Sequence, residues 1–170
     1  MRNYIFLLTI LSILLSSCNK PLPKKEENPK FVRTWYDTVH GMPLKERLNI
    51  NADKTFEYTS RACESGSESN GTWKIENDTI ILKSIKPKGC RFQHRFGLCI
   101  VVGDKSYIEN NKTIKDCEPS GRDSSYEIFE NEKFYIRNDT LIYINKENDP
   151  CPELKIAFSI KEKIRIKYYK

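Results

Sequence analysis

The twelve residues GTWKIENDTIIL, from Gly71 to Leu82, decide the fold of this chain. Large apolar residues alternate with polar ones on both sides of the pair Asn77-Asp78. Alternation with a period of two is typical of a half-buried β-strand. Asn and Asp tolerate the positive φ angles that a two-residue hairpin turn requires. The sequence therefore predicts two antiparallel strands joined by a tight turn at Asn77-Asp78.

This hairpin pattern occurs a second time, because IENDTII from Ile75 is matched by IRNDTLI from Ile136. Alternation also runs through 31–36, 48–58 and 154–168, with a turn expected at 51–54 and a polar loop at 63–71. No stretch after Phe31 repeats apolar residues at helical spacing. Two copies of a short hairpin are too few for a solenoid. We therefore predict an antiparallel all-β domain, built as a meandering sheet or a barrel.

The N-terminal residues 1–17 resemble the signal peptide of a bacterial lipoprotein. A basic start precedes an apolar run of 12 residues, from Tyr4 to Leu15. That run is too short for a membrane span, which needs about 20 residues. The sequence Leu15-Ser-Ser-Cys18 that follows resembles a lipobox. The resemblance implies that Cys18 is cleaved on its amino side and carries diacylglycerol and a further acyl chain such as palmitate. An ordinary signal peptide with a nearby cysteine is the alternative.

Residues 18–30 are expected to form a lipidated cysteine and a flexible tether. The segment 19–30, NKPLPKKEENPK, holds three prolines and six charged residues, with Leu22 as its only large apolar side chain. Such a composition cannot bury enough apolar surface to order itself. The domain proper is then residues 31–170. We expect the chain to be lipid-anchored in the bacterial cell envelope, at the outer membrane.

Charge excludes two classes of function. The chain has 170 residues, of which 31% are charged, and a net charge of +6. That polarity excludes a multi-span membrane protein, and the mild basicity does not fit a nucleic-acid binder. Six of the basic groups lie at 155–170 beside one acid, Glu162. Lysines that solvate a strand are the expected explanation. A basic face that meets anionic lipid, polysaccharide or an acidic partner is the alternative.

Four short motifs resemble small lipocalin-like lipoproteins of the Bacteroidetes. They are RTWY at 33–36, LNINADKTF at 48–56, GTWKI at 71–75 and DTI with a following leucine at 78–82. The resemblance covers about a third of the chain and implies an up-and-down barrel of about eight strands. Such an interior is filled by side chains or holds one small ligand. The candidate lining residues are Trp35, Phe56, Tyr58, Trp73, Phe134 and Tyr143.

The five remaining cysteines are expected to form disulfides, because an exported protein meets an oxidising compartment. The favoured pairs are Cys90 with Cys99 and Cys117 with Cys151, which leaves Cys63 free. A bond between Cys63 and Cys90 is the main alternative.

No metal or cofactor site is expected. Cys90, His94 and Cys99 could serve as three metal ligands, yet they lack the close cysteine pairs of structural zinc sites.

No catalytic constellation is apparent, and the chain is not expected to be an enzyme. The sequence has no nucleophile elbow, P-loop or zinc-protease motif. It has two histidines, and Glu57, Glu76 and Glu127 are expected on outward strand positions.

Two functions stay open at this point. The first is a barrel that binds a small apolar or amphipathic ligand. The second is a structural or inhibitor-like envelope protein with a packed barrel.

Overall fold

The computed structural model describes residues 30–38, 45–61, 66–97, 112–113, 117, 119, 125–147, 153 and 155–162. The predicted signal peptide, most of the tether and the basic residues 163–170 lie outside this part of the chain. The described residues hold strands and turns and no helix. The strands are β1 (Thr34–Asp37), β2 (Lys45–Ile50), β3 (Thr55–Arg61), β4 (Gly66–Glu76), β5 (Thr79–Ser84), β6 (Phe92–Arg95), β7 (Lys112–Thr113), β8 (Ser125–Ile128), β9 (Glu130–Arg137), β10 (Thr140–Ile144) and β11 (Ala157–Ser159).

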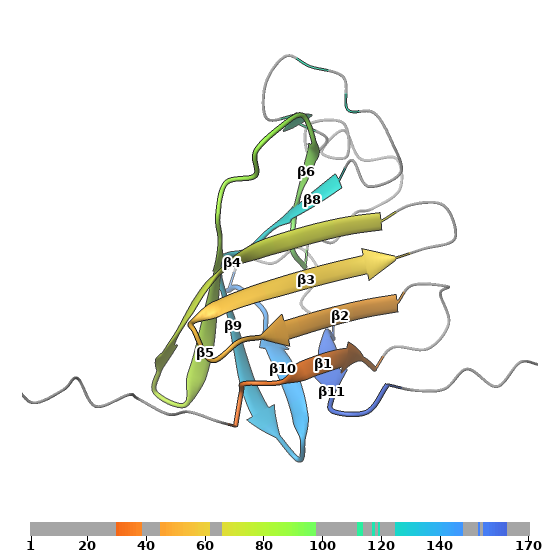
Figure 1. The fold of residues 1–170 in the computed structure, drawn as a ribbon. Helices are drawn as coiled ribbons and strands as arrows, with labels where there is room; N and C mark the ends of the chain where they lie inside the picture. Colours follow the sequence, from red (N-terminus) through yellow and green to blue (C-terminus); the bar gives the residue numbers. More distant parts are fainter. Residues whose placement is uncertain are drawn as a thin grey trace, which may run out of the picture.

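Eight of these strands close into an antiparallel barrel (Figure 1). The order around the barrel is β1-β2-β3-β4-β5-β9-β10-β11, and β11 pairs with β1 to close it. Strands that are neighbours in the barrel therefore also follow one another in the chain, with one insertion between β5 and β9. The predicted fold class, an antiparallel up-and-down barrel of eight strands, is confirmed.

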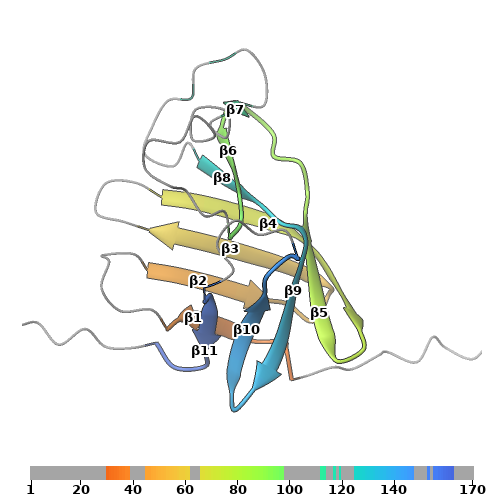
Figure 2. The same cartoon turned by 180° about the vertical axis from the view of Figure 1, so that it is seen from behind.

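The insertion adds β6, β7 and β8 to one side of the barrel wall (Figures 1 and 2). β8 pairs in parallel with the first residues of β4, at Ser67 and Glu68. β6 pairs in parallel with β8, and β7 pairs antiparallel with β6. β4 pairs with β5 further along, over Gly71–Glu76. The first residues of β4 thus pair with β8, and its later residues pair with β5.

The two matched hairpins fold as predicted and lie next to each other. Asn77 and Asp78 join β4 to β5 with φ angles of 48° and 61°, and Asn138 and Asp139 join β9 to β10 with 49° and 55°. β5 pairs with β9, so the two copies form four consecutive strands of the barrel. Only small polar residues and glycine adopt such angles at low cost, which explains Asn-Asp at both turns.

The barrel has two unlike ends. We call one the turn end: it carries the tight turns β2–β3, β4–β5 and β9–β10 at 51–54, 77–78 and 138–139. The other is the loop end, where the connections β1–β2, β3–β4, β10–β11 and the insertion begin. Figure 1 shows the β2–β3 and β4–β5 turns toward the lower left, the β9–β10 turn at the bottom, and β6 and β8 in the upper part. Each strand of the barrel wall therefore runs between the turn end and the loop end.

Apolar side chains fill the interior from the turn end upward. Phe31 seals that end as a fully buried residue, and the Trp35 indole donates to the Phe31 carbonyl oxygen at 3.0 Å. Gly71 stands opposite Phe56 in the β3–β4 ladder. A Cβ atom on Gly71 would lie 2.6 Å from the Phe56 ring and 2.1 Å from the Lys83 carbonyl oxygen. The GTW motif thus needs its glycine because the Phe56 ring uses that space.

The expected polar loop at 63–71 is partly wrong, because β4 begins at Gly66. Ser67 and Ser69 share the inward face of β4 with Gly71 and Trp73, while Glu68 and Asn70 alternate with them. The strand has normal alternation, but its inward residues here are serines, so a search for apolar periodicity misses it.

Candidate functional site

A polar layer lines the inside of the barrel at the loop end. Along β2, Glu46 alternates inward with Leu48 and Ile50, and along β3, Ser60 continues the inward face of Phe56 and Tyr58. The register places Glu46 opposite Ser60, and Ser60 opposite Ser67. Carboxyl and hydroxyl groups therefore replace apolar side chains around this mouth of the barrel.

Glu127 on β8 faces into this layer, which corrects the expectation of an outward position. Its Oε1 accepts a hydrogen bond from the Ser67 hydroxyl at 3.1 Å. Phe129, two residues after Glu127, is buried in the core. The expectation failed because β8 pairs in parallel with the start of β4, so its inward face is set by β4 and not by a neighbouring hairpin strand.

Two carboxyl groups in the layer are protonated more readily than usual. Burial and the charge of Asp37 raise the pKa of Glu46, and a hydrogen bond to Tyr58 lowers it. The resulting pKa is about 7. Burial raises the pKa of Glu127 to about 7, with the Ser67 bond opposing it and the charge of Glu46 adding to it. Burial also raises the pKa of Tyr58 well above 10, with the charges of Glu46 and Glu127 adding to it. Both carboxyl groups can exchange protons near neutral pH.

A third inward carboxylate, Glu132 on β9, is buried and fully paired. Its Oε2 accepts from the Tyr143 hydroxyl at 2.7 Å, and its Oε1 accepts from the Lys146 ammonium at 2.6 Å. The Glu130 backbone amide adds a bond of 3.2 Å to Oε1. The side chain is 1% exposed, whereas that of Lys146 is 38% exposed. This ion pair therefore ties the loop ends of β9 and β10 together.

Serine hydroxyls complete the layer. Ser69 and Ser84 are 2.7 Å apart, and Ser84 also donates to the Glu127 carbonyl oxygen at 3.3 Å and accepts from the Phe129 amide at 2.9 Å. Tyr126, on the other face of β8, donates to the Ile85 carbonyl oxygen at 2.6 Å. Side-chain hydrogen bonds thus hold β8 to β4 and to the end of β5, although only two residue pairs join β8 to β4 in the sheet.

The six candidate lining residues all belong to one buried cluster. Trp35 and Trp73 lie toward the turn end, where Trp73 donates to the Asn51 carbonyl oxygen at 2.9 Å. The Lys54 ammonium covers the outer edge of that end, 4.0 Å from the Trp73 ring. The other four candidates, Phe56, Tyr58, Phe134 and Tyr143, lie within a continuous set of ring contacts.

Phe96 and Phe129 complete that set of rings. They stack on each other with centroids 4.2 Å apart. Phe96 also touches Tyr58, Phe134 and Tyr143 at 5.5, 5.8 and 5.5 Å. Neither residue lies on a strand of the barrel wall, so the insertion fills the middle of the barrel with its own side chains. Phe96 and Phe129 could be identified as residues of the barrel interior only from the topology of the strands.

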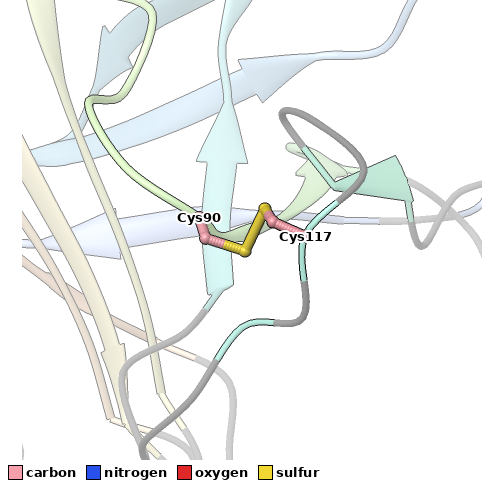
Figure 3. The surroundings of a disulfide bond; sticks show 2 residues. All are labelled: Cys90 and Cys117. Carbon is pink, nitrogen blue, oxygen red and sulfur yellow. A yellow bond between two sulfur atoms is a disulfide. The ribbon is translucent and has the colours of Figure 1, made fainter.

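The disulfide joins Cys90 to Cys117 (Figure 3). The expected pairs Cys90–Cys99 and Cys117–Cys151 are therefore wrong, and so is the alternative of Cys63 with Cys90. Phe92 pairs with Thr113 in the β6–β7 ladder, which carries Cys90 and Cys117 toward each other just beyond its end. Cys63, Cys99 and Cys151 lie outside the described residues. The disulfide thus staples the two outer strands of the insertion.

The alternative metal site at Cys90, His94 and Cys99 loses a ligand, because the Cys90 sulfur is bonded to Cys117. Burial lowers the pKa of His94 and so favours its neutral imidazole. Among the described residues no three His, Cys, Asp or Glu side chains are placed to hold a metal ion. No helix in the same part of the chain is long and apolar enough to cross a membrane.

Sequence reasoning missed three inward carboxyl groups, Asp37, Glu46 and Glu132. The signal was present for Glu46, which stands two residues before Leu48 in an alternating strand. Comparison with known proteins adds no further identification: no protein-family model, no curated protein and no solved structure matches this chain.

Proposed function

We propose that this chain is a lipid-anchored envelope protein whose packed barrel holds a protein-binding surface at its loop end. The observation that carries the proposal is the interior itself. Rings from the barrel wall and from the insertion interlock through its middle, with Phe96 and Phe129 stacked at 4.2 Å. A small apolar ligand would have to displace these rings. A packed interior therefore favours the binding of a partner by the outer surface.

The loop end is the favoured surface for three reasons. The longer connections begin there, and loops carry binding residues more often than the scaffold does. The two large apolar residues that are exposed among the described residues, Ile85 and Ile144, directly follow β5 or end β10 at this end. Tyr126 holds β8 to Asn70 of β4 at 2.9 Å and to Ile85 at 2.6 Å, and the disulfide joins the two outer strands of the insertion. A rigid surface with exposed apolar residues is typical of a protein interface.

The lipid anchor rests on the sequence around Cys18. Palmitate labelling of the full-length chain and of Cys18→Ala in a bacterial host tests it directly. We expect label on the unchanged chain and none on the variant. Label that persists on Cys18→Ala would contradict the anchor.

Native mass spectrometry of the lipidated protein, purified from its own membrane, tests the packed interior. We expect one species with the mass of lipid plus polypeptide and a second that is heavier by the mass of a protein partner, with no small apolar molecule in either. The matched control is Phe129→Ala, which removes one ring of the stack and opens an apolar cavity that accepts a probe such as benzene. A small molecule bound to the unchanged chain in a one-to-one ratio would contradict the proposal.

A further inference from the structure

We infer that the anchored barrel stands with its turn end on the lipid surface, so that the loop end points away from the membrane. This inference rests on the proposed lipidation of Cys18. It deepens that proposal, because it assigns the lipid headgroups to one end of the molecule and leaves the other end free for the protein partner.

The chain enters the barrel at the turn end and is fixed there. Phe31 is fully buried and holds the Trp35 indole by its carbonyl oxygen. Lys30, the last residue of the predicted tether, pairs with Asp78 of the β4–β5 turn at 2.6 Å. Figures 1 and 2 both show the start of β1 close to this hairpin. The tether is therefore attached to the turn end through residues that are held against the barrel.

The attachment point and the length of the tether together favour this orientation. Residues 19–30 reach about 40 Å when fully extended and about 20 Å as a flexible coil. β4 alone has 11 residues. A strand of that length spans about 35 Å. As a flexible coil the tether is shorter than this strand, so it holds the turn end nearer to the lipid surface than the loop end.

The two ends also differ in surface chemistry. Short turns made of Asn, Asp and Lys with one Ala cover the turn end, and both exposed large apolar residues of the described chain lie at the loop end. Short polar turns fit the hydrated headgroup layer. Exposed isoleucines beside the aqueous compartment fit a protein partner.

Lysine footprinting by mass spectrometry tests the orientation. The full-length lipidated protein is acylated with a water-soluble reagent in detergent micelles and in vesicles of phosphatidylethanolamine and phosphatidylglycerol. Lys54 and Lys74 report on the turn end, and Lys45, Lys86 and Lys88 report on the loop end. We expect vesicles to lower the labelling of the first pair several-fold and to leave the other three unchanged.

A lengthened tether supplies the matched control. A Gly-Ser segment inserted between Pro29 and Lys30 frees the barrel to tumble, so the protection of Lys54 and Lys74 should disappear while the protein stays on the vesicles. Equal labelling of both ends in the unchanged chain, or protection of the loop-end lysines, would overturn the orientation alone. A chain that does not float with vesicles would overturn the lipid anchor and, with it, this inference.

Discussion

The turn end and the loop end of the barrel are stabilised by different physical means. At the turn end, buried apolar side chains such as Phe31, Trp35 and Trp73 fill the interior, and short local turns join the strands. At the loop end, carboxyl and hydroxyl groups line the interior, and bonds between residues far apart in the chain hold the elements together. The bond from Ser67 to Glu127, for example, spans 60 residues. The first end depends on burial of apolar area, and the second on satisfied polar partners.

This difference separates stability from function. The turn end gains its free energy from buried apolar surface and contains few groups that could act on a partner. The loop end buries carboxyl groups, which costs free energy unless each one finds a partner or a proton. Buried carboxyl groups that cost free energy are retained most readily at functional sites. The contrast between the two ends therefore agrees with a binding surface at the loop end.

Truncation at each end should give the largest contrast. Phe56→Ala removes a fully buried ring near the turn end and should lower the free energy of unfolding by about 3–5 kcal/mol. Ser69→Ala removes one hydroxyl bond at the loop end and should cost about 1 kcal/mol. Denaturant unfolding followed by circular dichroism measures both. Equal losses would show that the two ends are not stabilised differently.

The sequence predicts the turn end well because its signals are local. Apolar alternation and Asn-Asp turns gave the two hairpins, and the register then placed Trp73 and Ile80 inside as expected. Each of these features depends on residues within about ten positions of one another, where periodicity and turn chemistry act directly.

The loop end was predicted poorly because its signals are long-range. β4 begins within a serine-rich stretch, where polar inward residues hide the alternation. Glu127 faces inward because β8 crosses onto β4, and Cys90 meets Cys117 because β6 pairs with β7. None of these pairings leaves a pattern in neighbouring residues, so sequence spacing favoured the shorter pair Cys90–Cys99.

Loss of the disulfide should act on the insertion and spare the barrel. The bond closes a loop of 27 residues. The chain-entropy argument gives about 3.5 kcal/mol for such a loop, or several hundredfold in an opening equilibrium. In Cys90→Ser/Cys117→Ser, amide hydrogen exchange of β6 and β8 should therefore speed up by about this factor. Exchange in β2 and β3 serves as the internal control, and equal acceleration there would show that the barrel depends on the insertion.

Removal of Lys146 should expose the cost of a buried carboxylate. Lys146→Met leaves Glu132 with only the Tyr143 hydroxyl and one backbone amide, and should cost about 2–3 kcal/mol at pH 7. The double variant Lys146→Met/Glu132→Gln removes the charge as well and should recover part of that loss. Additive losses in thermal unfolding would contradict coupling between the two side chains.

The raised pKa values of Glu46 and Glu127 predict a specific pH dependence. Between the ordinary value of 4.5 and about 7, the folded state binds more protons at these groups than the unfolded state does. Their contribution to stability is therefore fully present below pH 4.5 and is lost as pH rises to about 7, by at most about tenfold per pH unit for each group.

The variant Glu46→Gln/Glu127→Gln should flatten this part of the pH profile and should be more stable than the unchanged chain at pH 8. Glu57→Gln, an exposed outward carboxyl group on β3, is the matched control and should leave the profile unchanged. Parallel pH profiles of the double variant and the unchanged chain would contradict the raised values.

The smallest effect compares the two copies of the hairpin. Asp78 and Asp139 have φ angles of 61° and 55°, where glycine is favoured over aspartate. Asp139→Gly should therefore raise the free energy of unfolding by about 0.5–1 kcal/mol. Asp78→Gly gains the same backbone relief but loses the exposed bond to Lys30, so it should gain less. The difference between the two variants measures how firmly the tether is fixed to the turn end, and it should vanish in a Lys30→Ala background. If it persists there, the contact between Lys30 and Asp78 does not hold the tether.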